Sequence, residues 1–186
     1  DMMALHNMNA FHWHLSEDQG WRIEIKKYPK LMEVGAWRSG TVVGHNSDVD
    51  DHQPHGGFYT QEEIKQIVEY ARQRHIKVIP EIDIPGHTKA LLAAYPELGC
   101  TGGPYETAMR WGIFEDILCA GNAKTYDFVK AVLDKVCALF PSKYIHIGGD
   151  EAPRTRWEKC PKCQSVIAKE GIVAKDGKSK EALLQG

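Results

Sequence analysis

Three short apolar segments alternate with longer amphipathic segments along the chain. Ala10–Leu15 is apolar and aromatic, Ile76–Ile84 is rich in β-branched residues, and Lys143–Ile147 is a shorter apolar run. Short runs of this composition are typical of buried β-strands. Pro85-Gly86 follows the second run and Gly148-Gly149 follows the third. We therefore predict three strands with sharply defined carboxyl ends.

The segments between these strands carry helical patterns. Thr60 is followed three residues later by Glu63, the sequence signature of a capping box, and apolar residues then recur at helical spacing. The predicted helices cover residues 60–75, Thr88–Tyr95, Thr125–Phe140 and Trp157–Glu170. Short helical turns are expected at Tyr28–Met32 and Ala36–Arg38, and loops at Ser16–Gln19, Gly40–Gly57, Pro96–Asn122 and Lys175–Lys180.

This alternation of helix and strand favours parallel βαβ units and hence an α/β fold. A Rossmann-type sheet is one option, but no strand is followed by the GxGxxG turn that marks such a fold. The other option is part of a (β/α)8 barrel, in which the chemistry lies at the carboxyl ends of the strands.

Composition limits the function classes. The chain has 186 residues, a formal net charge of −2, 42% hydrophobic residues and 26% charged residues. These values suit a soluble globular protein and not a disordered one. A near-neutral charge gives no electrostatic reason to expect nucleic acid as a partner. No apolar run approaches the roughly 18 residues of a membrane-spanning helix.

Both ends of the chain carry helical patterns. Asp1–Met8 is apolar at helical spacing with no cap before it, and Ser179–Gln185 has the pattern of a helix start. We therefore expect residues 1–186 to be part of a larger domain that is truncated at both ends. On that expectation the missing signal peptide says nothing about location.

Polar residues follow all three predicted strands, and parallel neighbours would bring them to one rim. The first group contains Ser16, Glu17, Asp18, Gln19 and Trp21, the second Asp83 and His87, and the third Asp150 and Glu151. Two adjacent carboxyl groups at a strand end favour general acid chemistry. The alternative is a Gly-Gly turn followed by solvated acids.

The histidines allow a second kind of site. His12 and His14 alternate on a strand and so face the same side. Such a pair either holds a catalytic metal or consists of hydrogen-bonded core histidines. His146 follows the alternation of the third strand and is expected to point inward, near the acids.

The five cysteines are Cys100, Cys119, Cys137, Cys160 and Cys163. Cys137 lies in an apolar helical stretch and is expected in the core. Cys100 and Cys119 flank a Gly-rich loop and are either a disulfide or two free thiols. Cys160 and Cys163 form a CxxC, for which no second ligand pair stands at the spacing of a zinc site, so we expect local structural thiols.

Tryptophan is frequent for this length. Aromatic faces can stack on the apolar faces of sugars as they do on other flat apolar surfaces. At least half of these residues are nevertheless expected in the core. They are Trp13, Trp21, Trp37, Trp111 and Trp157.

Three motifs together resemble one enzyme family. His146–Glu151 (HIGGDE) is similar to the H-x-G-G-D-E signature of family 20 glycoside hydrolases, the β-N-acetylhexosaminidases. Asn9–Trp21 resembles the N-x-F-H-W-H-L stretch of that family, and Glu81–His87 resembles its third-strand motif. The resemblance extends over nearly the whole chain and implies a (β/α)8 barrel. The strands of this chain would be the second, third and fourth of that barrel.

The resemblance also implies a mechanism. Family 20 enzymes are retaining, and the substrate's own 2-acetamido oxygen acts as the nucleophile. Glu151 would be the acid/base, and Asp150 would orient the acetamido group. Glu17, where the family often has Asp, would lie near the sugar hydroxyls. Asp83 and His87 would form a polar pair that supports the acid, and His146 would lie behind them. A sugar-binding Arg and the aromatic walls of the acetamido pocket would come from outside this chain.

The resemblance further implies substrates that are N-acetylhexosamine-containing glycans of the chitobiose or glycoconjugate type. It implies no cofactor and no metal, and a secreted, periplasmic or lysosomal location. Two alternatives stay open, a metal-dependent barrel hydrolase using His12 and His14, and a non-catalytic carbohydrate-binding fragment. GGDE also begins a cyclic-dinucleotide synthase motif, but Ala152-Pro153 follows it here. We expect the segment alone to be poorly stable and inactive.

Overall fold

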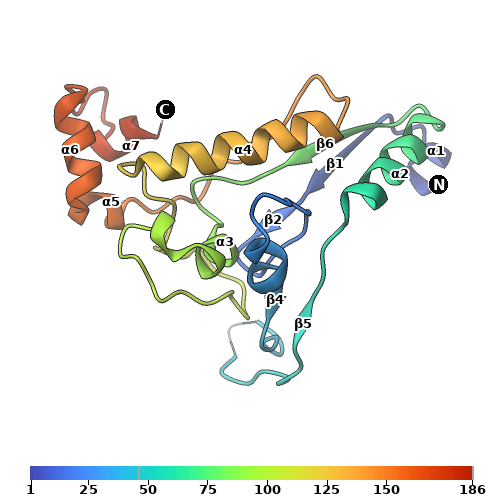
Figure 1. Cartoon of the computed structure of the whole chain (residues 1–186), viewed down its shortest axis with the longest axis horizontal. Helices are drawn as coiled ribbons and strands as arrows, with labels where there is room; N and C mark the ends of the chain where they lie inside the picture. Colours follow the sequence, from blue (N-terminus) through green and yellow to red (C-terminus); the bar gives the residue numbers. More distant parts are fainter. Residues whose placement is uncertain (46, 186) are drawn as a thin grey trace.

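The computed structural model describes residues 1–45 and 47–185. Asn46, within the predicted 40–57 loop, and Gly186 lie outside the described residues. Strands β1 (Ala10–His14) and β6 (Lys77–Glu81) form a parallel pair, with His14 opposite Glu81. This pair confirms the first two predicted strands and their parallel order (Figure 1).

The third predicted strand lies beside β6 but is less regular. A parallel bridge joins Glu81 to His146. The backbone N–H of His146 donates to the carbonyl oxygen of Pro80 at 2.9 Å, and Ile82 N–H donates to the carbonyl oxygen of His146 at 3.1 Å. Tyr144 is exposed, as expected for a segment at a sheet edge. The described residues thus form a mixed α/β structure with an open, partial sheet.

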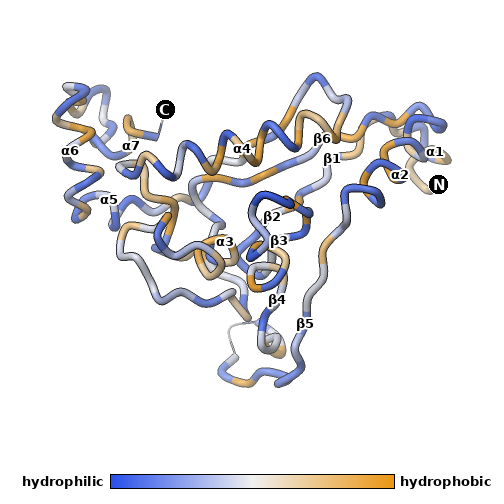
Figure 2. Tube along the Cα trace, viewed as in Figure 1, coloured by the Kyte–Doolittle hydropathy of each residue, from blue (hydrophilic) through white to orange (hydrophobic). Residues whose placement is uncertain are grey.

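Two long helices flank the strands (Figure 1). Helix α2 (Gln61–Arg72) begins at the predicted capping box, in which Thr60 and Glu63 exchange hydrogen bonds. Helix α4 (Ala123–Leu139) begins slightly earlier than predicted, because Asn122 caps its first turn. Apolar and polar residues alternate along α4 in Figure 2. Its apolar side, including Val132, is buried in the main core.

The shorter helices differ in one respect from the prediction. Residues 157–170 were expected to form one helix, but α5 (Thr155–Lys159) and α6 (Pro161–Lys169) are separate. Pro161 explains the break, because proline has no N–H to continue a helix but suits the first turn of a new one. The remaining helices are α1 (Met2–Leu5), α3 (Lys89–Ala94), the 3₁₀-helix η2 (Pro96–Leu98) and α7 (Lys180–Leu184).

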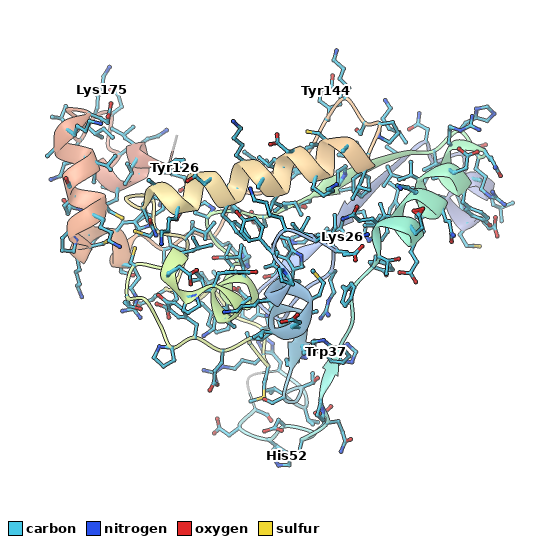
Figure 3. All side chains as sticks on the ribbon, in the orientation of Figure 1. Lys26, Trp37, His52, Tyr126, Tyr144 and Lys175 are labelled. Atoms are coloured by element: carbon cyan, nitrogen blue, oxygen red, sulfur yellow. The ribbon has the colours of Figure 1, made fainter. Side chains whose placement is uncertain are left out.

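Two small antiparallel pairs occur where loops or turns were expected. The predicted loop after β1 forms a hairpin of β2 (Ser16–Glu17) and β3 (Gly20–Trp21). The predicted turn at 36–38 instead contains β4 (Trp37–Arg38), which pairs with β5 (His55–Gly56). The π-helix η1 (Leu31–Gly35) covers part of the turn predicted at 28–32. Figure 3 shows Trp37 and His52 on the protrusion that these strands support.

The structure corrects one cysteine prediction and decides between the alternatives of another. Cys137 is exposed on α4 and not in the core, because it lies on the polar side of that helix. Cys100 and Cys119 are free thiols, so the disulfide alternative is absent from this structure. Within the part of the chain that the structure describes, no helix has the length and apolar character needed to span a membrane.

Candidate active site

The carboxyl ends of β1, β6 and the third segment surround one cavity of about 670 Å³. Its lining includes every residue that the sequence assigned to the site: Glu17, Asp83, His87, His146, Asp150 and Glu151. The strand order explains this convergence, since parallel neighbours present their carboxyl ends at the same edge.

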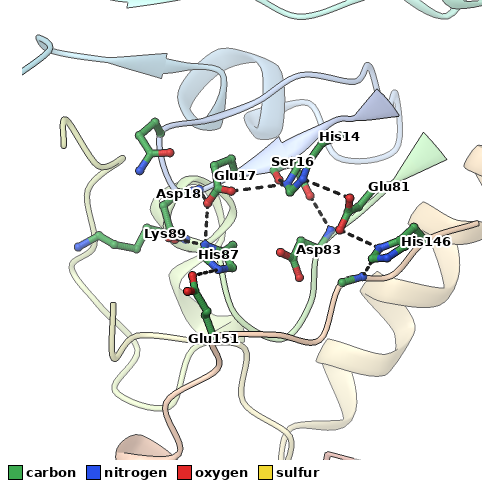
Figure 4. Close-up of polar contacts among 12 residues, drawn as sticks. His14, Ser16, Glu17, Asp18, Glu81, Asp83, His87, Lys89, His146 and Glu151 are labelled. Atoms are coloured by element: carbon green, nitrogen blue, oxygen red, sulfur yellow. Dashed lines mark hydrogen bonds and ion pairs between the residues drawn. The ribbon is translucent and has the colours of Figure 1, made fainter. Parts of the chain in front are cut away.

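His87 is the centre of the polar network (Figure 4). Its Nδ1 lies 2.8 Å from Glu17 Oε1 and 3.2 Å from Asp18 Oδ2, and its Nε2 lies 3.3 Å from Glu151 Oε2. Burial by itself lowers the pKa of His87, but the charges of Glu17, Asp18 and Asp83 outweigh it and raise that pKa above its usual value. The network therefore favours an imidazolium, which can donate hydrogen bonds from both nitrogens.

Asp18 is a member of this network that the sequence grouped with the polar residues but did not assign to the site. Its side chain is almost fully buried, and burial raises its pKa to about 6, against a hydrogen bond from the backbone N–H of Lys89 that lowers it. The charge of Glu17 adds to the increase. A carboxyl group with this pKa can hold or release a proton near neutral pH.

Asp83 interacts with His87 through its charge, but its hydrogen bonds are to residues that the sequence did not suggest. Its backbone N–H donates to Ser16 Oγ at 2.9 Å, and its Oδ1 accepts a hydrogen bond from Gly149 N–H at 3.2 Å. Burial raises the pKa of Asp83, and the Gly149 hydrogen bond opposes that increase. Asp83 thus binds the turn that leads to Asp150, while Glu17 is the hydrogen-bond partner of His87 Nδ1.

Gly148 is needed for this close approach. Its φ of +66° is in the left-handed region, and a Cβ atom there would overlap the carboxylate of Asp83. We expect Gly148→Ala to lower the unfolding temperature and kcat of the full-length protein together, because the turn must move and Asp150 moves with it.

Gly171→Ala is the matched control. Gly171 has a similar φ of +63° but open space at the Cβ position, so it should show only the backbone cost, about 1–2 kcal/mol. Equal decreases in unfolding temperature for both variants, measured by calorimetry, would show that contact with Asp83 is not what demands glycine at position 148.

Glu81 is the main residue that sequence reasoning missed. It is buried at the end of β6, and its carboxylate lies within 2.5 Å of His12 Nε2, 3.2 Å of His14 Nδ1 and 2.8 Å of His146 Nδ1. The rings of His12 and His146 lie 4.9 Å apart. Glu81 is the first residue of the Glu81–His87 motif, so that motif already indicated that Glu81 could belong to the site.

Several of these groups have the chemistry of metal ligands. One ligand atom from each of His12, Glu81 and His146 lies within 4.8 Å of the others, and so do those of His87, Asp150 and Glu151. The first group contains the nitrogen and oxygen donors that zinc accepts. The contacts of the Glu81 carboxylate with the histidines give the same residues a role without a metal, so the geometry is compatible with both interpretations.

Two tryptophans lie in the core and one lies at the cavity. Trp21 and Trp157 are almost fully buried, whereas Trp111 is 65% exposed and lines the cavity with Gly112. Trp111 is therefore placed where an aromatic face could contact a ligand.

This arrangement defines the class of protein: an α/β fold in which carboxylates and a histidine meet at the carboxyl ends of parallel strands. The model of glycosyl hydrolase family 20, catalytic domain, matches residues 1–183. The chain belongs to this family.

Individual relatives agree with the assignment. A β-hexosaminidase of Porphyromonas gingivalis is 48% identical over 92% of this chain and 21% of its own length. A crystal structure of a β-N-acetylhexosaminidase matches the whole chain and 39% of that protein, with a TM-score of 0.86 and 37% identity. The exo-β-N-acetylglucosaminidase of Vibrio harveyi, in complex with N-acetylglucosamine, matches 99% of this chain and 30% of its own, with a TM-score of 0.76 and 35% identity. The chain thus spans well under half the length of these relatives.

Proposed function

We propose that this chain forms the acid/base part of a β-N-acetylhexosaminidase, which removes terminal β-linked N-acetylglucosamine or N-acetylgalactosamine from glycans. The observation that carries the proposal is that Asp150 and Glu151 line the same cavity, with a nitrogen of His87 within 4.8 Å of both carboxylates. The chain would supply strands two to four of a (β/α)8 barrel, and the remaining walls of the sugar pocket would come from other strands.

The proposed reaction has two steps. In the first, the acetamido oxygen of the substrate attacks the anomeric carbon while Glu151 gives a proton to the departing glycosidic oxygen. The product of this step is an oxazolinium ion. In the second, Glu151 takes a proton from water, which attacks the same carbon and restores the acetamido group with overall retention. Asp150 accepts a hydrogen bond from the acetamido N–H and stabilises the developing positive charge.

His87 and Glu17 would position the acid in this reaction. Nε2 of His87 faces Glu151 Oε2, and Nδ1 of His87 contacts the carboxylate of Glu17. An imidazolium at this position keeps Glu151 oriented and stabilises its carboxylate after proton transfer. Glu17, which stands where the family often has Asp, would therefore act through His87 in addition to any contact with sugar hydroxyls.

The test compares two substrates that differ only at the 2-position. For the full-length protein we expect kcat/KM on an aryl β-N-acetylglucosaminide to exceed that on the matching aryl β-glucoside by at least about 10³-fold. The physical reason is that an intramolecular nucleophile has a very high effective concentration. Proton NMR should show the β-anomer as the first product. Similar rates on the two substrates would contradict the acetamido mechanism.

A metal-dependent hydrolase is a second candidate, favoured by the proximity of His12, Glu81 and His146. The same substrate comparison separates the two, because a metal-activated water has no need of the 2-acetamido group. A non-catalytic carbohydrate-binding role would instead give binding with no turnover of either substrate.

A further inference from the structure

Four of the five cysteines form a cluster that shares no residue with the histidine network. Cys100 lies just after η2, Cys119 lies shortly before α4, and Cys160 and Cys163 lie at the start of α6. The Sγ–Sγ distances are 3.9 Å between Cys100 and Cys163, and 3.7 Å from Cys119 to both Cys160 and Cys163. All four sulfur atoms lie within 4.8 Å of one another. The sequence showed no second ligand pair for the CxxC because the partners are 41 to 63 residues away.

These distances correspond to the edges of a tetrahedron around a metal ion. A Zn–S bond is about 2.3 Å, which places the sulfur atoms of a tetrahedral Cys₄ site about 3.8 Å apart. A disulfide requires about 2.05 Å. We propose that Cys100, Cys119, Cys160 and Cys163 bind one structural zinc ion.

The surroundings suit anionic sulfur ligands. Cys119, Cys160 and Cys163 are buried, and Cys160 is the N-cap residue of α6, where the helix dipole favours negative charge. The backbone N–H of Gly121 donates toward the sulfurs of Cys119 and Cys163.

Neighbouring residues hold the loop of Cys119 against α6. A Cβ atom at Gly121 would overlap the backbone of Lys162 and Cys163, so only glycine permits this approach. The hydroxyl of Tyr126, labelled at the start of α4 in Figure 3, donates to the carbonyl oxygen of Ala120 at 2.8 Å. These contacts bring the Cys119 loop and α6 close enough for their sulfur atoms to share one ligand.

The zinc ion would join two segments that border the active-site cavity. One is the loop between η2 and α4, which contributes Trp111 to the cavity lining. The other runs from Glu151 through α5 to α6, and within α5 Trp157 Nε1 donates to the carbonyl oxygen of Leu118 at 2.9 Å. Zinc binding releases the four thiol protons and needs no oxidant. The free energy of zinc binding adds to the stability of the folded state.

The test uses the full-length protein, purified with reducing agent, and elemental analysis by mass spectrometry. We expect about one zinc per wild-type chain, and loss of that zinc in Cys119→Ser and Cys163→Ser. Cys137→Ser, which removes an exposed cysteine outside the cluster, and His146→Ala should both retain it. Replacement of zinc by Co²⁺ should give thiolate-to-cobalt charge transfer and the strong visible bands of tetrahedral coordination. This readout needs only the wild-type protein, so it holds even where a cysteine variant does not fold.

Three results would overturn the proposal. One is a reduced wild-type protein that contains no zinc as purified and binds none when zinc is added. Another is zinc retained by both cysteine variants. The third is zinc lost from His146→Ala alone, which would assign the metal to the histidine cluster. The first two results leave the substrate comparison unaffected, so the zinc site and the proposed reaction can fail separately. The third result would instead support the metal-dependent alternative, which the substrate comparison tests directly.

Discussion

Glu151→Gln is expected to reduce kcat on substrates with poor leaving groups by about 10²–10⁴-fold, the usual contribution of general acid–base catalysis. Glutamine has the shape of glutamic acid but cannot give a proton to the departing glycosidic oxygen. The decrease should be much smaller on aryl glycosides with acidic phenols, which leave without protonation. Steady-state kinetics on chitobiose and on a nitrophenyl glycoside measure both effects.

Glu158→Gln is the matched control, because Glu158 is an exposed glutamate on α5, a few residues further along the chain. It should leave both rates near those of the wild type. An equal loss on chitobiose and on the nitrophenyl glycoside for Glu151→Gln would argue against an acid role and for a general effect on folding.

Asp150→Asn is expected to lower kcat on N-acetylglucosaminides by about 10²–10³-fold, the magnitude typical of removing one preorganised electrostatic contact in a transition state. Asparagine carries no charge to stabilise the oxazolinium ion. A thiazoline inhibitor that imitates this ion should bind more weakly to the variant by a similar factor, as measured by competitive inhibition.

Asp134→Asn removes the same charge from an exposed position on α4. It should change neither kcat on N-acetylglucosaminides nor the affinity for the thiazoline inhibitor. Unchanged thiazoline affinity in Asp150→Asn, together with a lower kcat, would show that Asp150 does not contact the acetamido group.

Local pattern was sufficient for the elements that local interactions determine. The capping box at Thr60 and Glu63 predicted the start of α2, and a short aromatic run and a short β-branched run predicted β1 and β6. The errors arose where a neighbour far away in the sequence decides the conformation. Trp37–Arg38 pairs with His55–Gly56, and no pattern within residues 36–38 shows that partner.

The candidate site was predicted as a set of residues but not as a set of contacts. All six assigned residues line one cavity, because the strand order alone brings the strand ends together. Glu81 and Asp18 were not assigned, since a carboxylate at a strand end has the same sequence signal whether it faces solvent or three histidines. The position of Glu17 near sugar hydroxyls stays a prediction, and the structure adds its contact with His87.

By itself the sequence determined the family, the parallel order of the strands and the position of Asp150-Glu151, because each depends on residues close together in the chain. Only the tertiary structure decided which groups touch. The pairing of Glu17 with His87, the burial of Glu81 and the meeting of Cys100 and Cys119 with Cys160 and Cys163 all join distant segments. Hydrogen bonds and metal coordination act over about 2–4 Å, and such distances between distant segments exist only once the chain is folded.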